Sequence, residues 1–313
     1  MAEPRRLKEL ADAISQRARF PSEPHLVALS GGADSAALAF IAKRASSRKP
    51  RGVHVHHGLA ASDVLAEAAG AIAEVLEMAC DVVSVDLSEG PSPEAMAREA
   101  RYRALEQAVA SNETVLLGHT RNDQAETVLL NLIRGAGLRG LSGMPYQRTS
   151  QMYRPFLDVT RDETRELATL CGLPFVDDPT NTDTSLRRNF VRLELIPRME
   201  ELNPNVVDSL ARTAEHVRGD SEFLDQLHPA PIAIDGGNAR VATGILLTLE
   251  PPLRARAIAA FVGAFRASDA ITAAELARVE EVLNGASAGA ELEGGLTVVK
   301  RGAYLVVAPG NVR

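Results

Sequence analysis

The chain is poor in cysteine, aromatic residues and long hydrophobic runs. Its 313 residues include two cysteines, no tryptophan and only 4% aromatic residues. Neither Cys80 nor Cys171 belongs to a Cys-x-x-Cys pair, which argues against a disulfide framework and against cysteine-based zinc or iron–sulfur sites. We expect both thiols to be buried and neutral. No apolar run approaches the roughly 20 residues that span a membrane, and the first residues lack a signal-peptide pattern, so we expect a cytoplasmic protein.

An overall excess of basic residues is also missing, because the net charge is −7. The charge is unevenly distributed, however. Between residues 98 and 198 all 14 basic residues are arginines, against 13 acidic residues. Arginine makes paired hydrogen bonds to phosphate better than lysine does. The sequence therefore permits a basic groove for nucleic acid, although the net charge alone argues against one.

Short β-like runs alternate with helical stretches over the first two hundred residues. This pattern is typical of a parallel sheet with helices on both faces, an α/β fold of the Rossmann-like, adenine nucleotide α-hydrolase type. The expected strands cover residues 26–29, 52–55, 82–85 and 114–117, and the expected helices cover residues 61–79, 93–110 and 123–134. Ligands of such sheets bind beyond the carboxyl ends of the strands, so we expect the site there.

A second, smaller domain is expected to follow Asn203-Pro204-Asn205. We predict three segments: a catalytic domain over residues 1–205, a linker helix over 206–227 and a small C-terminal α+β domain over 228–313. Within the last segment we expect a loop or linker at 228–240, helices at 252–267 and 272–283, and a hairpin of strands 296–299 and 304–307.

The most informative motif is Ser30-Gly31-Gly32-Ala33-Asp34-Ser35, between an apolar run and a helix-forming stretch. Adjacent glycines let backbone N–H groups approach an anion, and the helix start adds partial positive charge and unpaired donors. Ser30 and Ser35 offer hydroxyl donors. The Asp34 carboxylate repels an anion unless a cation lies between the carboxylate and the anion. The motif predicts a loop that binds Mg²⁺-pyrophosphate. It is not a Walker-type loop, because the Gly-Lys-Ser/Thr ending is absent.

A second polar group begins at Gly118-His119, where an expected strand ends. Asp123 and Glu126 follow near the start of a helix and are spaced to share one of its faces. Acidic residues are also ordinary in a first helical turn, so this pattern alone leaves a structural role open. Arg188 and Arg192 are likewise spaced to share a helical face, where they either contact phosphate or form a solvated pair.

In their order, these motifs resemble those of the tRNA(Ile)-lysidine synthetases, which are PP-loop enzymes of the N-type ATP pyrophosphatase class. The matching segments are residues 30–35, 53–59, 94–102, 119–127, 134–144, 154–155, 177–181 and 188–192. The resemblance covers about residues 25–205, and the tail looks like the single small C-terminal domain of the shorter members. Two positions depart from the family pattern: His56, where Asn or Asp is usual, and Ala60, which is often Arg.

The resemblance implies a two-step, ATP-dependent ligation. O2 of the wobble cytidine in the CAU anticodon of tRNA(Ile) attacks the α-phosphate of ATP, and free L-lysine then displaces AMP from C2 to give lysidine. Catalytic roles are implied for Asp34, Asp123, Glu126, Arg188 and Arg192, with Mg²⁺ on Asp34 and Asp123 and lysine recognition by Glu126. The implied ATP-binding residues are Ser30, Gly31, Gly32, Ala33, Asp34, Ser35, His54, His57, Gly118 and His119.

Other functions stay open on the sequence. A PP-loop tRNA thiolase needs sulfur on cysteine or on an iron–sulfur cluster, against which the unpaired Cys80 and Cys171 argue. Ammonia-using relatives that make NAD or GMP share the loop, but they do not explain the arginine-rich middle third. In a protein that only binds nucleotide or tRNA, Asp34, Asp123 and Glu126 would have no catalytic purpose. The sequence also permits a homodimer.

Overall fold

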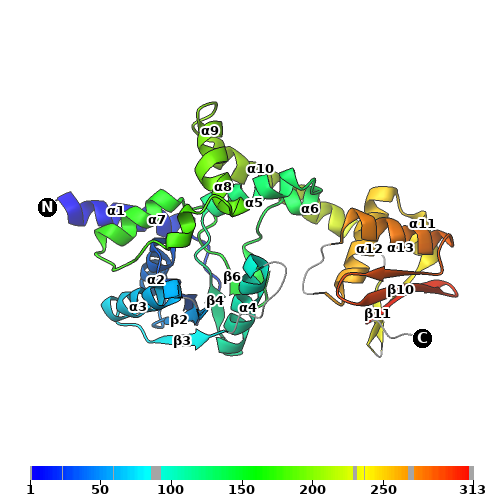
Figure 1. Ribbon diagram of the computed structural model, residues 1–313, viewed down its shortest axis with the longest axis horizontal. Coiled ribbons are helices and arrows are strands. Elements are labelled where there is room, and N and C mark those ends of the chain that lie inside the picture. Colours follow the sequence, from blue (N-terminus) through cyan, green and yellow to red (C-terminus); the bar gives the residue numbers. More distant parts are fainter. Residues whose placement is uncertain are drawn as a thin grey trace. The chain divides into compact units, whose positions relative to one another are not determined.

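The computed structural model describes residues 2–22, 24–58, 60–85, 93–227, 231–235, 237–266 and 271–309. It divides into two compact units, Met1–Arg218 and Gly219–Arg313 (Figure 1). Helix α10 (Val206–Gln226) contains the division, which falls after Arg218, inside the segment that the sequence marks as a linker helix. None of the helices in the described ranges is long and apolar enough to cross a membrane.

A six-stranded sheet of order β3-β2-β1-β4-β6-β5 forms the centre of the first unit. Its strands are β1 (His25–Ala28), β2 (Arg51–His56), β3 (Cys80–Ser84), β4 (Thr114–Leu116), β5 (Gln147–Thr149) and β6 (Met152–Tyr153). All are parallel except the edge strand β5. The predicted α/β class is confirmed, and the four expected strands lie within two residues of β1 to β4.

Helices cover both faces of this sheet. Because side chains alternate between the two faces along each strand, the strands contribute to both hydrophobic cores. Val27 and Leu116 pack toward one face, whereas Leu26 and Val115 pack toward the other. The first face carries α1 (Ala2–Arg17), α2 (Ala33–Ala45), α3 (Ala60–Val75) and α7 (Arg161–Leu170); the second carries α4 (Pro93–Ala108) (Figure 1). Two buried faces explain why the strands are apolar runs.

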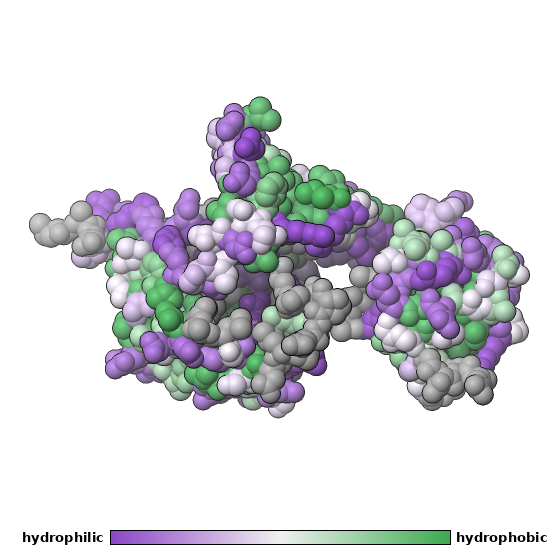
Figure 2. Space-filling model, in the orientation of Figure 1, coloured by the Kyte–Doolittle hydropathy of each residue, from purple (hydrophilic) through white to green (hydrophobic). Residues whose placement is uncertain are grey.

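A further group of helices extends the first unit beyond the sheet. It comprises α5 (Arg121–Ile133), α6 (Leu138–Leu141), the 3₁₀ turn η1 (Pro179–Thr182), α8 (Arg187–Phe190), the π-helical turn η2 (Val191–Leu195) and α9 (Ile196–Glu200). Helices α5, α9 and the start of α10 share a small core around Leu129, Ile196 and Val206. Phe190 and Leu193 are exposed, and Figure 2 shows hydrophobic residues on the surface of this helical group.

The second unit has a five-stranded antiparallel sheet of order β7-β8-β11-β10-β9. Its elements are β7 (Ala233–Asp235), β8 (Asn238–Ala242), α11 (Thr243–Thr248), α12 (Pro251–Gly263), α13 (Ala273–Asn284), β9 (Gly289–Leu292), β10 (Leu296–Arg301) and β11 (Tyr304–Pro309). Helices α12 and α13 bury Phe261 and Val279 against Val241 and Val298 of the sheet. The expected C-terminal hairpin is confirmed as the pair β10 and β11.

The expectation of a loop or linker at 228–240 is wrong for its later part. Ala233–Asp235 and Asn238–Ala242 pair as antiparallel strands. Gly237, with φ +81°, lies between them, and Ala239 and Val241 are buried while Arg240 is exposed. Gly237 thus belongs to a hairpin turn rather than to a linker. Residues 228–230 and 236 lie outside the described residues.

Candidate active site at the carboxyl edge of the sheet

The loop between β1 and α2 is a tight turn beyond the carboxyl end of β1. Gly31 has φ +86°, and a Cβ there would lie 2.5 Å from the backbone oxygen of Leu65, so only glycine fits. The Ser35 hydroxyl donates to the Gly32 carbonyl (2.9 Å) and accepts from the Ser30 N–H (3.1 Å). Gly32 caps α2 without a side-chain hydrogen bond to the helix end. This cradle has the donor-rich, side-chain-free form that suits a phosphate.

Gly118, which follows β4, approaches the same turn. A Cβ on Gly118 would lie 3.3 Å from the Cα and N of Ser35. The structure therefore brings the first predicted motif and the start of the second into backbone contact, as expected for adjacent parallel strands β1 and β4.

Three carboxylates converge beside the loop, two of them from α5 and one from α2. Arg161, the first residue of α7, contacts all three. Its Nε lies 3.8 Å from Asp34 Oδ2, and its Nη2 lies 3.0 Å from both Asp123 Oδ1 and Glu126 Oε1. Asp34, Asp123 and Glu126 are thus gathered in one cluster, as the sequence predicted.

Arg188 and Arg192 complete this cluster from α8 and η2. The Nε of Arg188 lies 2.7 Å from Glu126 Oε2 and its Nη2 3.1 Å from Asp123 Oδ1. The Nε of Arg192 lies 2.8 Å from Glu126 Oε1. Both arginine side chains are only 23% exposed, and Glu126 is fully buried. The interpretation of Arg188 and Arg192 as a solvated pair is therefore wrong.

The two carboxylate oxygens of Asp123 have different partners. Its Oδ2 accepts from the N–H and hydroxyl of Thr120 (2.8 and 2.9 Å), which caps α5, while Oδ1 faces the arginines. Burial alone would raise the pKa of Asp123, but the guanidinium groups of Arg188 and Arg161 outweigh it and lower that pKa well below its usual range. Asp123 is therefore an anion at neutral pH.

The environment of Asp34 shifts its pKa upward, in the opposite direction to the shift at Asp123. Burial and the nearby charge of Asp123 raise the pKa of Asp34 to about 6, against a hydrogen bond donated by the Thr164 hydroxyl and the positive charge of Arg161. Two carboxyl groups that share a site are expected to differ in this way. A cation between Asp34 and Asp123 would relieve their repulsion.

These residues fit Mg²⁺, which prefers oxygen ligands and is commonly held by one or two carboxylates together with phosphate oxygens. Asp34 and Asp123 supply the carboxylates, and Arg161 bridges them. Over the described residues no group of three or more His, Cys, Asp or Glu side chains is arranged to hold a metal alone. A metal here would thus take its remaining ligands from a nucleotide and water.

The histidines predicted to contact ATP are neutral and incompletely paired. Burial lowers the pKa of His54 and His57, and lowers that of His119 well below its usual range. His54 Nδ1 is bonded to the Leu29 carbonyl (2.8 Å). Buried ring nitrogens without a protein partner remain on all three: Nε2 of His54, and Nδ1 of His57 and of His119. Such groups are available for a ligand.

An arginine group surrounds Tyr102 of α4. The guanidinium carbons of Arg98, Arg101 and Arg148 lie 5.2, 5.5 and 3.8 Å from the ring centroid. Burial raises the pKa of Tyr102, but Arg98 and Arg101 outweigh it and lower that pKa to about 8, with Arg154 adding to the effect. No ion pair joins these four arginines to a carboxylate of the described part of the chain. The group is a concentration of positive charge that suits phosphate.

Comparison with known proteins decides the family. Residues 3–199 match the PP-loop domain family. A tRNA(Ile)-lysidine synthase of Salinispora arenicola is 41% identical over 306 residues, which is 91% of this chain and 90% of that protein. The corresponding protein of Streptomyces coelicolor is 38% identical over 302 residues, or 91% and 85%. The chain belongs to the tRNA(Ile)-lysidine synthase family. The resemblance of its motifs to that family is thereby confirmed.

A solved structure supports the fold of this lysidine synthase relative. The U34-tRNA thiolase of Methanococcus maripaludis, with its [4Fe-4S] cluster, superposes with a TM-score of 0.54. The likeness covers 67% of this chain and 78% of the thiolase at 17% identity. At that identity it bears on the fold alone.

The family departure at His56 has a local explanation. The N–H of Gly58 donates to Nδ1 of His56 (3.1 Å), and Nε2 of His56 then donates to Asp63 (2.9 Å). An Asn or Asp at this position would offer a side-chain acceptor to the same N–H two residues on. His56 therefore preserves the turn. Ala60 begins α3, and its side chain lies outside the described part.

Sequence reasoning missed Arg161 and Thr164, which both reach the cluster from the first turn of α7. The Thr160-x-x-Glu163 capping box marks the start of this helix. An arginine at the first helical position is unfavourable next to the positive end of the helix dipole. That misplaced charge was the available signal that Arg161 has an acidic partner.

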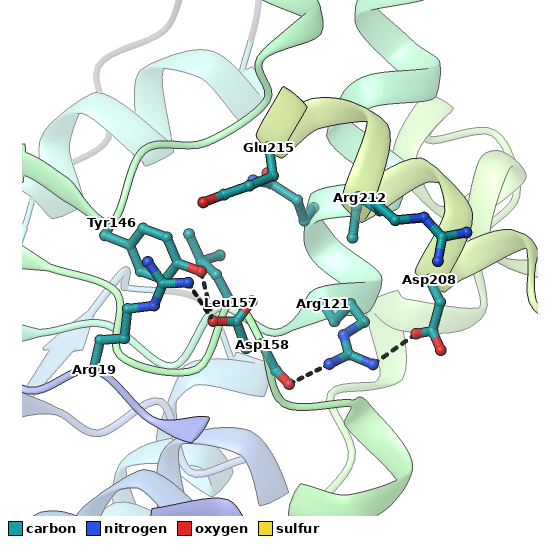
Figure 3. A pocket seen from close by; sticks show the side chains of 10 residues that line it. Arg19, Arg121, Tyr146, Leu157, Asp158, Asp208, Arg212 and Glu215 are labelled. Carbon is teal, nitrogen blue, oxygen red and sulfur yellow. Dashed lines mark hydrogen bonds and ion pairs between the residues drawn. The ribbon is translucent and has the colours of Figure 1, made fainter. Parts of the chain in front are cut away.

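A separate pocket of about 330 Å³ lies on another side of α5. Its lining includes Arg121, Asp158 and Tyr146, and the Tyr146 hydroxyl donates to Asp158 (2.7 Å) (Figure 3). Arg121 pairs with Asp208 (2.6 Å) and donates to the Asp158 carbonyl (2.6 Å). Asp123 and Glu126 do not line this pocket. Its charges neutralise each other locally, unlike those around Tyr102.

Proposed function

We propose that the protein ligates L-lysine to C2 of the wobble cytidine of CAU-anticodon tRNA(Ile), using ATP and releasing pyrophosphate and AMP. The observation that carries the proposal is the convergence of Asp34 with Asp123 and Glu126 beside the PP-loop. It occurs in a chain that aligns over nine tenths of its length with a tRNA(Ile)-lysidine synthase. We further propose that the protein acts in the cytoplasm, and that the second unit contacts the tRNA.

The first step needs a triphosphate held in line with the attacking cytidine O2. The turn at residues 30–35 and Gly118 would hold the phosphates leaving as pyrophosphate, and Arg188 or the arginines around Tyr102 would balance charge that grows on them. Asp34 and Asp123 would hold Mg²⁺, which neutralises negative charge on the phosphates. The unpaired nitrogens of His54, His57 and His119 are candidates for contacts to the nucleotide.

The second step needs an uncharged amine. The lysine ε-amine has a pKa of about 10.4 in water, so it must lose a proton before it attacks C2. Glu126 is our candidate for receiving the ammonium group and helping to remove that proton. Glu126 is bound by three guanidinium groups at 2.7–3.0 Å, so lysine must displace at least one of them. A bound triphosphate would attract those arginines away.

The thiolase alternative is disfavoured by the position and state of the thiols. Burial raises the pKa of Cys80, and it raises that of Cys171 to about 11. Cys80 is the first residue of β3, at the edge of the sheet opposite the site. Cys171 caps the far end of α7, about 15 Å along the helix from Arg161. Neither cysteine is a ready sulfur carrier for chemistry at Asp34.

Separating the two steps tests the proposal. With ATP and the tRNA but no lysine, the wild-type protein should release pyrophosphate, whereas Asp123→Asn should lower this release at least about 1,000-fold. Glu126→Gln should retain pyrophosphate release yet lose lysine-dependent AMP formation. Pyrophosphate release that needs no tRNA, or full activity of Asp123→Asn, would contradict the proposal.

A further inference from the structure

Arg161 holds a position that none of the motifs assigns. In the described part of the chain it is the one side chain that contacts Asp34, Asp123 and Glu126 together. The other two arginines of the cluster reach only Asp123 and Glu126. Arg161 is therefore the link between the PP-loop carboxylate and the pair on α5.

The base of Arg161 is fixed. Its backbone N–H donates to the Asn122 side chain (2.9 Å), and Thr164, one turn later, donates to Asp34. Burial lowers the pKa of Arg161, but the carboxylates outweigh this and raise it. The side chain is thus a permanent cation, 25% exposed, on a helix start that is tied to both α2 and α5.

The guanidinium of Arg161 contacts both carboxylates that would hold a shared metal. Its Nε faces Asp34 Oδ2 at 3.8 Å and its Nη2 faces Asp123 Oδ1 at 3.0 Å. A Mg²⁺ ion bound by both carboxylates needs about 2.1 Å to each oxygen, and two cations repel strongly at such separations. Arg161 and a metal that bridges Asp34 and Asp123 therefore compete for one region.

We propose that Arg161 is a positioning residue that serves as a resident counter-cation. Before nucleotide arrives it pairs with Asp123 and offsets only part of the charge of Asp34. It then yields Asp34 to the metal that enters with the triphosphate while remaining paired with Glu126. The consequence is that bare divalent ions bind weakly, so metal and nucleotide enter together. This proposal rests on the metal ligands given under the proposed function.

Mn²⁺ binding to the full-length protein, followed by the electron paramagnetic resonance signal of free Mn²⁺, tests the idea directly. Without nucleotide, Arg161→Ala should bind Mn²⁺ about ten-fold or more tightly than wild type, because a competing positive charge is removed. Arg161→Lys keeps the charge and should stay within about three-fold of wild type. With α,β-methylene-ATP present, the wild-type protein should gain much more Mn²⁺ affinity than Arg161→Ala does.

Matched controls separate this role from a structural one. Arg6→Ala removes an exposed arginine that pairs with Glu166 on the outer side of the same helix, and it should leave Mn²⁺ affinity unchanged. Asp34→Asn in the Arg161→Ala background should abolish the gain. Unchanged or weaker Mn²⁺ binding by a folded Arg161→Ala protein would overturn the proposal.

Lysine ligation is assayed separately on the same wild-type preparation. If the expected Mn²⁺ pattern appears without ligation, the role of Arg161 stands and the proposed function fails. If ligation occurs without that pattern, the proposed function stands and the proposed role of Arg161 fails.

Discussion

At the scale of single residues, the site depends on an imbalance between neighbouring carboxyl groups. Asp123 is held as an anion by Arg188 and Arg161, whereas burial and the charge of Asp123 raise the pKa of Asp34 to about 6. The folded protein thus maintains an unfavourable negative charge at Asp34 at neutral pH. An unfavourable negative charge of this kind is expected at a site where a bound cation later compensates it.

The charge on Asp34 should have a measurable cost in stability. A pKa of about 6 in the fold, against the usual 3.8, means that the native state binds this proton more tightly than the unfolded state. Stability is therefore lost as pH rises from about 4 to 6 and stays lost above 6. The free energy of unfolding of Asp34→Asn should exceed that of wild type by up to about 3 kcal/mol at pH 7.5 without metal or nucleotide, and by almost nothing at pH 4.

Urea unfolding at several pH values measures this difference. Asp162→Asn, at an exposed carboxylate in the first turn of α7, serves as the control and should destabilise slightly at pH 7.5 through loss of a favourable helix-end charge. An Asp34→Asn protein that is less stable than wild type at pH 7.5 would show that the charge of Asp34 is well compensated.

Arg188 gives a second prediction at this scale. Arg188→Ala should raise the KM for ATP about ten-fold, because a phosphate-directed cation is lost, while Arg161 and Arg192 still neutralise Glu126 and keep the fold intact. The neighbouring Arg187 is exposed, and Arg187→Ala should change neither KM nor Tm. Unaltered kinetics for both ATP and tRNA in Arg188→Ala would confine its role to structure.

At the scale of elements, the site is assembled by the starts of helices. Helix α2 brings Asp34, α5 brings Asp123 and Glu126, and α7 brings Arg161, with α8 and η2 closing the cluster. The carboxylates lie on helices that follow parallel strands, so their meeting follows from the connectivity of the sheet. That part of the site was therefore predictable from the sequence.

The remainder was not predictable, for physical reasons. Arg188 and Arg192 come from helices that do not directly follow a strand, so no strand order fixes their position. Arg161 begins α7, which follows β6, but that strand is only two residues long and is too short to recognise from the sequence. The hairpin of β7 and β8 was missed because each strand is short and glycines lie between them, which is also the composition of a loop. Periodicity identifies elements, whereas tertiary contacts decide which charged side chains meet.

The turn after β1 gives a prediction for an element. Gly31→Ala should destabilise the protein by at least roughly 1–2 kcal/mol, since φ is +86° and the new Cβ would clash with the Leu65 carbonyl. It should also raise the KM for ATP. Gly70→Ala, on the same helix α3 as Leu65 and with open space around it, should instead stabilise by up to roughly 1 kcal/mol. Thermal unfolding of the two variants checks the difference, and equal Tm values would contradict the account of this turn.

At the scale of the whole molecule, the chain forms two units with separate hydrophobic cores, to which we assign different roles. The first contains every residue of the carboxylate cluster, and the second is a compact sheet and helix unit with no share in it. A role for the second unit in tRNA contact stays a prediction, as does a homodimer. The elements of both units were largely predictable from the sequence, but the division falls inside α10, where a continuous helix offers no break in the pattern.

The central claim is that these parts join lysine to one particular tRNA. The most direct measurement is incorporation of labelled L-lysine into an unmodified CAU-anticodon tRNA(Ile) transcript, with ATP and Mg²⁺, beside a CAU-anticodon methionine tRNA. We predict label in the isoleucine tRNA alone, with one AMP released for each lysine joined. Absence of label from the isoleucine tRNA, while AMP is released with sulfur donors or other amines, would contradict it.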